Sequence, residues 1–157
     1  MKSKLSIALL ALALVALTVP AVSAAGRNTT VVEAKMKGKF VVDGGIKKGG
    51  ATIQISLKPT QSKLCFEFTA KKLDPIIYGA VHKGAEGELG KEKIQLFSDD
   101  AGLDGNGSYE GCVKKIKSTL LEKIAAKPEK FYADLDTMAY PDGAVRGQLK
   151  LSEPEQE

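Results

Sequence analysis

The chain has 157 residues, of which 43% are hydrophobic and 27% are charged, and its formal net charge is +4 at pH 7. This length suits one domain with a real hydrophobic core, and it excludes a large multidomain protein. The sequence contains two cysteines and one histidine, which excludes metal centres that need several imidazole ligands.

The N-terminus has the pattern of an export signal. Lys2 and Lys4 form a short positive region, residues 5–19 are apolar, and small residues at 21–24 suit a cleavage site. The apolar run is shorter than the ~20 residues of a typical membrane-spanning helix, although a retained N-terminal anchor is the alternative. We expect residues 1–24 to be a signal peptide cleaved after Ala24. The mature protein would then be secreted, extracellular or periplasmic, with no transmembrane segment.

Short runs of alternating polar and apolar residues dominate the rest of the chain. This period of two is typical of strands with one buried face. The clearest runs are residues 52–57, 64–68, 131–135 and 145–151, and the last of these predicts a core-facing row of Val145, Gly147, Leu149 and Leu151. Weaker strands are expected at residues 30–34, 39–42, 76–82, 93–97 and 109–113.

Glycine-rich segments separate these strands, at residues 43–45, 48–50, 84–90 and 99–107. Segment 116–126 differs, because apolar residues recur there at helical spacing until Lys127 and Pro128 end the pattern. Many short strands with one inserted helix predict an all-β fold, either an antiparallel β-sandwich or a barrel. The domain would span residues 29–151, between a disordered lead at 25–28 and an acidic tail at 152–157.

The charge is distributed unevenly along the chain. Residues 27–72 contain ten Lys or Arg and three Asp or Glu, whereas residues 73–157 contain eleven and sixteen. A basic patch can attract anionic partners such as cell-wall polymers or lipid headgroups, although a solvated surface is the more common outcome. No nucleic-acid-binding motif is present and the lysines are not interleaved with stacking aromatics, so a nucleic-acid partner is not expected.

Cys65 and Cys112 are the two cysteines. Export would place them in an oxidising compartment, which favours an intramolecular disulfide over two buried free thiols. In the chain-entropy model a bond that closes a loop of this length stabilises the fold by roughly 4 kcal/mol.

Several segments together resemble the CHRD (chordin-type) domain family. Residues 64–68 (LCFEF), 79–87 (GAVHKGAEG) and 111–113 (GCV) are similar to it in order and spacing. The most specific match is residues 128–137 (PEKFYADLDT) followed by 140–149 (YPDGAVRGQL), where Tyr140 to Gly143 reads as a turn. The resemblance covers roughly residues 29–151. It implies a Greek-key sandwich similar to copper–zinc superoxide dismutase, and an extracellular domain whose biochemical activity is poorly defined.

The chain departs from the family pattern at two histidine positions. Ala80 stands where the family often carries the first histidine of a His-x-His pair, so only His82 is kept. Asp136 stands where the family has a histidine before the threonine. A dismutase copper site needs several imidazoles, so we expect no catalytic metal and no cofactor.

The candidate polar or ligand residues are His82, Asp136 and Arg146. If the family arrangement holds, the strand faces that carry His82 and Asp136 lie near one another. Such a pair could hold a weakly bound metal ion, but two ligands are too few for a closed zinc site. The alternatives are a hydrogen-bonded structural pair and no contact between the two residues. For Arg146 the choice is between a guanidinium satisfied by carbonyls or a carboxylate of the fold and a contact with an anion or partner.

A polar loop and two sequons complete the candidate sites. The loop at residues 99–108 could offer oxygen ligands to calcium. Its spacing is not that of an EF-hand, so a solvated turn is the preferred interpretation. Asn28 and Asn106 begin formal glycosylation sequons, which would be used only in a eukaryotic host. The oxygen-bearing residues of the loop are Asp99, Asp100, Asp104, Asn106 and Ser108.

Two classes of function follow from these observations. The first is a secreted, non-enzymatic module that binds another protein or a cell-envelope polymer, or has a structural role there. The alternative is a metal- or redox-dependent enzyme of dismutase-like ancestry. The single histidine and the two departures from the family pattern favour the first class.

Overall fold

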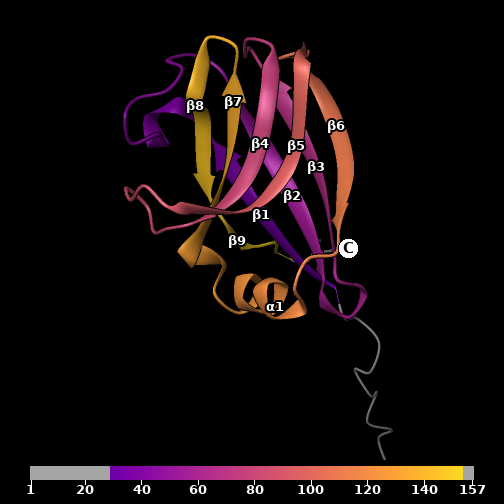
Figure 1. The fold of residues 1–157 in the computed structure, drawn as a ribbon. Coiled ribbons are helices and arrows are strands. Elements are labelled where there is room, and N and C mark those ends of the chain that lie inside the picture. Colours follow the sequence, from indigo (N-terminus) through magenta and orange to yellow (C-terminus); the bar gives the residue numbers. More distant parts are fainter. Residues whose placement is uncertain (1–28, 154–157) are drawn as a thin grey trace, which may run out of the picture.

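The structure is a computed structural model, and it describes residues 29–153. The expected signal peptide, the lead at 25–28 and the last four residues of the acidic tail lie outside the described residues. Within residues 29–153 the chain forms two antiparallel sheets that face each other, as predicted, with one α-helix at one end (Figure 1). None of the helices in this range is both long and apolar enough to cross a membrane.

The first sheet has five strands in the order β6-β3-β2-β1-β9. Its members are β1 (Thr30–Met36), β2 (Gly50–Lys58), β3 (Lys63–Lys71), β6 (Gly107–Lys114) and β9 (Lys150–Leu151). The second sheet has the order β5-β4-β7-β8, with β4 (Ile76–Lys83), β5 (Lys91–Leu103), β7 (Phe131–Thr137) and β8 (Tyr140–Gln148). The chain crosses between the sheets after β3, β5, β6 and β8, which leaves β5 and β6 as the two strands at one open edge (Figure 1).

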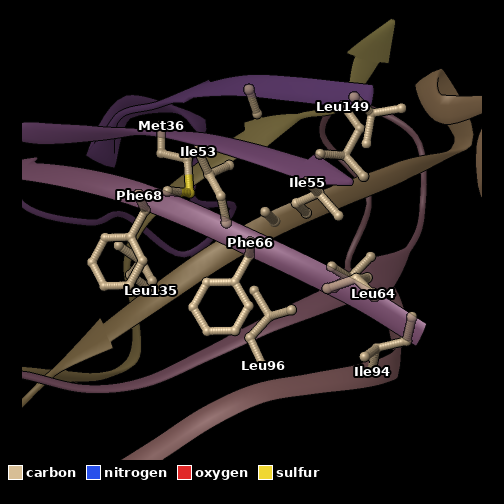
Figure 2. Close-up of a cluster of buried hydrophobic side chains, with 14 of the residues drawn as sticks. Met36, Ile53, Ile55, Leu64, Phe66, Phe68, Ile94, Leu96, Leu135 and Leu149 are labelled. Carbon is tan, nitrogen blue, oxygen red and sulfur yellow. The ribbon is translucent and has the colours of Figure 1, made fainter. Parts of the chain in front are cut away.

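The core lies between the sheets and follows from the period-two pattern. In β2, alternate residues from Ala51 to Leu57 are buried, whereas Thr52 and Gln54 are exposed on the outer face. Ile53, Phe68 and Leu135 approach one another in the middle of the sandwich (Figure 2). Burying one such side chain stabilises the fold by about 1.5–3 kcal/mol, so these rows set which face of each strand turns inward.

The inserted helix closes one end of the sandwich. Helix α1 spans Ser118–Ala126, close to the predicted segment, and its buried residues Leu121 and Ile124 face the core. Ser118 does not cap the helix; its hydroxyl donates to the Pro59 carbonyl at 3.0 Å and so ties the helix to the β2–β3 connection.

The strand predicted at residues 39–42 is wrong. Gly38–Phe40 form a 3-10 helix instead, in which the Val41 N–H donates to the Gly38 carbonyl at 3.1 Å. A Cβ atom on Gly38 would lie 2.0 Å from the Ile46 carbonyl oxygen, so the chain folds tightly against itself here. Residues 39–42 hydrogen-bond locally and are not paired with a strand, which a short apolar run cannot reveal in the sequence.

Three other boundaries differ from the predictions. The expected break at 99–107 begins later, because β5 continues to Leu103. The turn expected at Tyr140 to Gly143 lies at residues 138–139, and Pro141 is accommodated inside β8 because an edge strand can lack a backbone N–H. Leu151 does not share the core row of Leu149: the chain leaves β8 after Gln148 and crosses to the first sheet, where Leu151 is 53% exposed.

Candidate functional site

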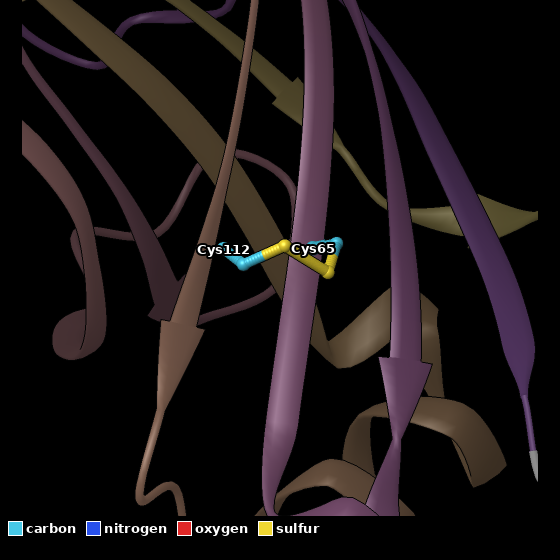
Figure 3. Close-up of a disulfide and its surroundings, with 2 residues drawn as sticks. All are labelled: Cys65 and Cys112. Atoms are coloured by element: carbon cyan, nitrogen blue, oxygen red, sulfur yellow. A yellow bond between two sulfur atoms is a disulfide. The ribbon is translucent and has the colours of Figure 1, made fainter.

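The two cysteines lie side by side on neighbouring strands. Cys65 of β3 is the direct cross-strand partner of Cys112 of β6, with Cα atoms 4.0 Å apart, and the two form the predicted disulfide (Figure 3). Cys112 is exposed on the outer face of the five-stranded sheet. The bond therefore fastens the edge strand β6 to its neighbour β3.

A cluster of polar side chains lies on the outer face of the second sheet. Strand β7 runs between β4 and β8, with Tyr132 opposite both His82 and Gln148, and Asp134 opposite Arg146. Because side chains two residues apart share a sheet face, these five residues meet on one surface. We call them the polar cluster: His82, Tyr132, Asp134, Arg146 and Gln148.

Tyr132 is the centre of the polar cluster. Its ring stacks on the His82 imidazole with centroids 4.9 Å apart and an interplanar angle of 7°, and the guanidinium carbon of Arg146 lies 3.4 Å from its ring centre. Since β4 and β8 flank β7, the imidazole and the guanidinium reach the ring from the two neighbouring strands. The Tyr132 hydroxyl accepts a hydrogen bond from the Gly90 N–H at 3.1 Å.

Arg146 is 4% exposed, and the fold itself satisfies its charge. Its two terminal nitrogens donate to the carbonyls of Glu88 at 2.7 Å and Ala85 at 2.8 Å. A buried guanidinium needs such partners, and the π face of Tyr132 adds a favourable cation–π contact. Of the two interpretations of Arg146 from the sequence, this geometry matches the one in which carbonyls of the fold hold it.

Gln148 extends the same arrangement. Its side-chain nitrogen lies 2.8–2.9 Å from the carbonyl oxygens of Gly84, Glu129 and Phe131. Together with Tyr132 and Arg146 it fixes the glycine-rich connection between β4 and β5, residues 84–90. Sequence reasoning missed Tyr132 and Gln148, although both lie in the closing motif that carried the family resemblance.

His82 bonds to oxygen acceptors through both ring nitrogens. Nδ1 lies 3.1 Å from the Gly90 carbonyl oxygen, and Nε2 lies 3.2 Å from an oxygen of the Asp134 carboxylate. Burial lowers the pKa of His82, but the hydrogen bond and the charge of Asp134 outweigh it, and the net pKa is raised. Two facing acceptors favour the doubly protonated imidazolium.

His82 and Asp136 form no ion pair, which is one of the alternatives that the sequence left open. The carboxylate partner of His82 is Asp134, whereas Asp136 lies opposite Tyr78 one step further along β4 and β7. Burial raises the pKa of Asp136 to about 7, and the negative charge of Asp134 acts in the same direction. The register places Asp134 beside the imidazole, and the sequence alone could not distinguish the two aspartates.

The neighbouring acidic groups do not form a ligand set. Tyr78 donates to the Glu92 carboxylate at 2.8 Å, and burial together with Glu92 raises the pKa of Tyr78 to about 12. Within residues 29–153, no three His, Cys, Asp or Glu side chains are grouped so that they could hold a metal ion.

The polar loop considered for calcium uses its oxygens as turn caps. Asp99 accepts hydrogen bonds from the backbone N–H groups of Ala101 and Gly102, and Asp104 accepts one from Asn106. The Asn106 side chain in turn accepts from the Lys72 N–H. The side chains of Asp99, Asp104 and Asn106 are thus occupied by contacts with backbone N–H groups.

A second surface lies on the outer face of the five-stranded sheet. Lys35 of β1 lies opposite Thr52 of β2, and Lys71 of β3 lies opposite Gly50. The small residues of β2 leave a hollow between the lysines of its two neighbours. We call this the lysine hollow; its lining is Lys35, Lys37, Gly49, Gly50, Ala51, Thr52, Thr69, Lys71 and Lys72.

The lysines of the hollow are exposed and form no ion pair with any residue that the structure describes. Among residues 29–153 the ion pairs are Lys150–Glu33 and His82–Asp134, so no carboxylate lies within 4.0 Å of these four lysines. The charge count of residues 27–72 had indicated a basic half. The convergence of these lysines depends on strand register, which charge counting does not provide.

Comparison with known proteins agrees with the fold and the motif. A model of the CHRD domain family matches residues 32–149, from β1 to the residue after β8. A search of curated proteins and a search of solved structures each find no match to the chain. CHRD domains occur in extracellular proteins and are in general non-enzymatic. Since the match runs from β1 through β8 and includes the polar cluster, the chain belongs to the CHRD domain family.

Proposed function

We propose that this protein is a secreted, non-enzymatic module that binds an anionic polymer of the extracellular space or the cell envelope. The observation that carries this proposal is the lysine hollow, where four exposed lysines surround small residues of β2 without a carboxylate within 4.0 Å. A polymer with repeated negative charges can contact several of these lysines at once, which raises its overall affinity. An acidic protein surface is the alternative partner.

Two observations, the N-terminal sequence pattern and the disulfide, support secretion. The first 24 residues have the pattern of a cleaved signal peptide, and the Cys65–Cys112 disulfide suits an oxidising compartment. Mass spectrometry of the exported protein should give Ala25 as the N-terminal residue. A mature form that still contains residues 1–24 would contradict secretion by this route.

The non-enzymatic character is supported by how the polar cluster is used. The hydrogen-bonding groups of His82, Tyr132 and Arg146 are directed at carbonyls, an amide and a carboxylate of the fold itself. A catalytic acid, base or electrophile must instead present such groups to a substrate. The arrangement is that of a scaffold which fixes residues 84–90.

The proposal is tested by retention of the purified protein on an immobilised phosphate polymer, poly(glycerol phosphate), and a carboxylate polymer, polygalacturonate. The variant with Lys35→Gln, Lys37→Gln and Lys71→Gln should bind at least about tenfold more weakly, since long-range and contact charge both contribute. The matched control carries Lys123→Gln, Lys127→Gln and Lys130→Gln, which lie at the helix end and change the net charge equally.

Wild-type binding should weaken steeply with added salt, because screening shortens the reach of exposed charges. Equal loss of binding in both triple variants would show that only net charge matters and would contradict a site at the lysine hollow. If the wild-type protein binds neither of the two polymers at low salt, the proposal is overturned.

A further inference from the structure

Strands β5 and β6 end the two sheets at one edge of the sandwich, where their outer sides are not paired with another described strand. Within the part of the chain that the structure describes, β6 pairs only with β3 and β5 pairs only with β4, so each has one side without a hydrogen-bonded strand. The two strands lie next to each other at this edge, one in each sheet (Figure 1). Such an edge presents backbone N–H and C=O groups that can pair with another strand.

The register identifies which backbone groups of β6 are free. In an antiparallel pair, partners with the shorter Cα separation of about 4.5 Å do not exchange hydrogen bonds. Cys65 and Cys112 are 4.0 Å apart, so Cys112 directs its N–H and C=O away from β3. By the same alternation, the residues with outward backbone groups are Ser108, Glu110, Cys112 and Lys114.

A hydrogen bond on the opposite side of the sheet supports this assignment. The row of cross-strand partners that contains Cys112 and Cys65 continues through Ser56 to Val31. Alternation then requires that Val31 direct its carbonyl away from β2. That carbonyl accepts a hydrogen bond from the Ser152 N–H at 3.0 Å, as required.

Between the two strands lies a groove with a volume of about 730 Å³. Its apolar lining includes Ile94 and Leu96 of β5 and Val113 of β6, backed by the stacked rings of Phe66 and Phe97 with centroids 6.0 Å apart. Its charged lining is lysine only. These lysines are Lys93, Lys114, Lys115 and Lys117, all exposed, and no carboxylate within residues 29–153 lies within 4.0 Å of any of them.

The positive charge at this edge is concentrated by the strand register. Lys58, Lys63 and Lys114 are direct cross-strand partners on β2, β3 and β6. Like charges directly opposite each other destabilise a sheet, so this row gains from a negative partner. Edge lysines also discourage pairing with uncharged strands, which leaves an acidic strand as the matching one.

We propose that the free edge of β6 binds an extended acidic segment of a protein partner, which adds to the sheet as a further strand and places its acidic side chains against the groove lysines. The main chain of the segment would pair with the outward groups of β6, and alternate side chains would contact the apolar lining. This surface and partner go beyond the proposed polymer binding, which uses the other end of the sheet.

A second copy of the chain is the other candidate occupant, and the experiment distinguishes it.

The probe is an acetylated, amidated, fluorescent octapeptide of alternating glutamate and valine, titrated into the purified, disulfide-bonded protein. Lys93→Gln, Lys114→Gln and Lys117→Gln together should weaken binding at least about tenfold, whereas the triple variant at Lys123, Lys127 and Lys130 should change it less than about twofold. A peptide with N-methyl groups on alternate residues cannot donate to β6 and should also bind at least about tenfold more weakly.

Amide hydrogen exchange provides a readout that needs no variant. The N–H groups of Ser108, Glu110 and Cys112 should gain protection on peptide binding, whereas Tyr109 and Gly111 already pair with β3. Equal binding of the N-methylated peptide, or of a disordered polyglutamate, would overturn strand addition. A protein that sediments as a dimer through this edge and does not bind the peptide would assign the groove to a second copy and also overturn the proposal.

Discussion

The guanidinium carbon of Arg146 lies 3.4 Å from the ring centre of Tyr132, and the two residues come from neighbouring strands β8 and β7. Both side chains are almost completely buried, although they lie on the outer face of their sheet. They are covered by residues 84–90, whose carbonyls they bind. The closing motif of the CHRD domain therefore holds residues 84–90, the connection between β4 and β5, in place.

Replacing Arg146 by alanine should lower the free energy of unfolding by at least about 2 kcal/mol. Arg146 donates part-buried hydrogen bonds to the carbonyls of Ala85 and Glu88, and an acceptor that loses its donor away from water costs about 1–3 kcal/mol. Arg146→Lys should recover only part of the loss, because one ammonium cannot bind both carbonyls in a planar fork. Urea unfolding measures both effects.

Lys123→Ala is the matched control for Arg146, since Lys123 is an exposed cation on α1 and should change stability by less than about 0.5 kcal/mol. In the Arg146 variants, amide exchange should accelerate first within residues 84–90. A stable Arg146→Ala variant with unchanged exchange that loses binding to a ligand would instead identify Arg146 as a binding residue.

Stability should fall as the pH rises from about 4 to above 7. The pKa of Asp136 is raised by burial to about 7 in the folded state, so between its ordinary value of 3.8 and about 7 the folded protein holds a proton that the unfolded chain releases. Asp136→Asn keeps the neutral form at every pH. This variant should match the wild type near pH 4 and exceed its unfolding midpoint at pH 8.

His82 should also make the stability fall as the pH rises. Its pKa is raised in the folded state, so its stabilising contribution is complete below the unfolded value and is lost as the pH rises through the folded one. His82→Gln should remove the pH dependence of stability that comes from His82 and leave the pH dependence that comes from Asp136. Asp43→Asn, at an exposed position between β1 and β2, is the control. Stability that rises between pH 5 and pH 8 would contradict both assignments.

Much of the sandwich could be predicted because burial on one face imposes a period of two. β2, β3 and most of β7 follow that period, and α1 follows the helical spacing of Leu121 and Ile124. In β8, by contrast, residues 143–147 are all buried, so burial there does not alternate with the sequence. The period fails where the chain changes sheets. Leu149 and Leu151 share parity, but the crossover after Gln148 places them in different surroundings, and no local pattern marks that change.

The candidate site was harder to predict because its contacts depend on register between strands. The sequence indicated His82 and Arg146 as site residues, but the partner of His82 was decided by which residue of β7 lies opposite Ala80, namely Asp134. The lysine hollow depends on the alignment of β1, β2 and β3 in the same way. Register between distant strands is set by the whole core, so single-strand patterns do not contain it.

Removing the disulfide by Cys65→Ser and Cys112→Ser should cost roughly 4 kcal/mol, the chain-entropy value for a loop of 47 residues. Thermal unfolding of the double variant should match that of the wild type under reducing conditions, because Cys112 is exposed and a reductant can reach it. A double variant as stable as the oxidised protein would show that β6 is held by its pairing with β3 alone.

The comparison of Leu149 with Leu151 tests whether the crossover, and not the sequence pattern, decides burial. Leu149 is 1% exposed and lies where the chain leaves β8, with its N–H donating to the Phe131 carbonyl at 3.0 Å. Leu149→Ala should therefore lower the free energy of unfolding by about 2–5 kcal/mol, the usual cost of emptying a buried leucine site. Leu151 is 53% exposed, so Leu151→Ala should cost less than about 0.5 kcal/mol. Urea unfolding of the two variants gives the difference directly. Equal losses would mean that Leu151 is covered in solution, and a row of alternating core residues would then continue past Gln148.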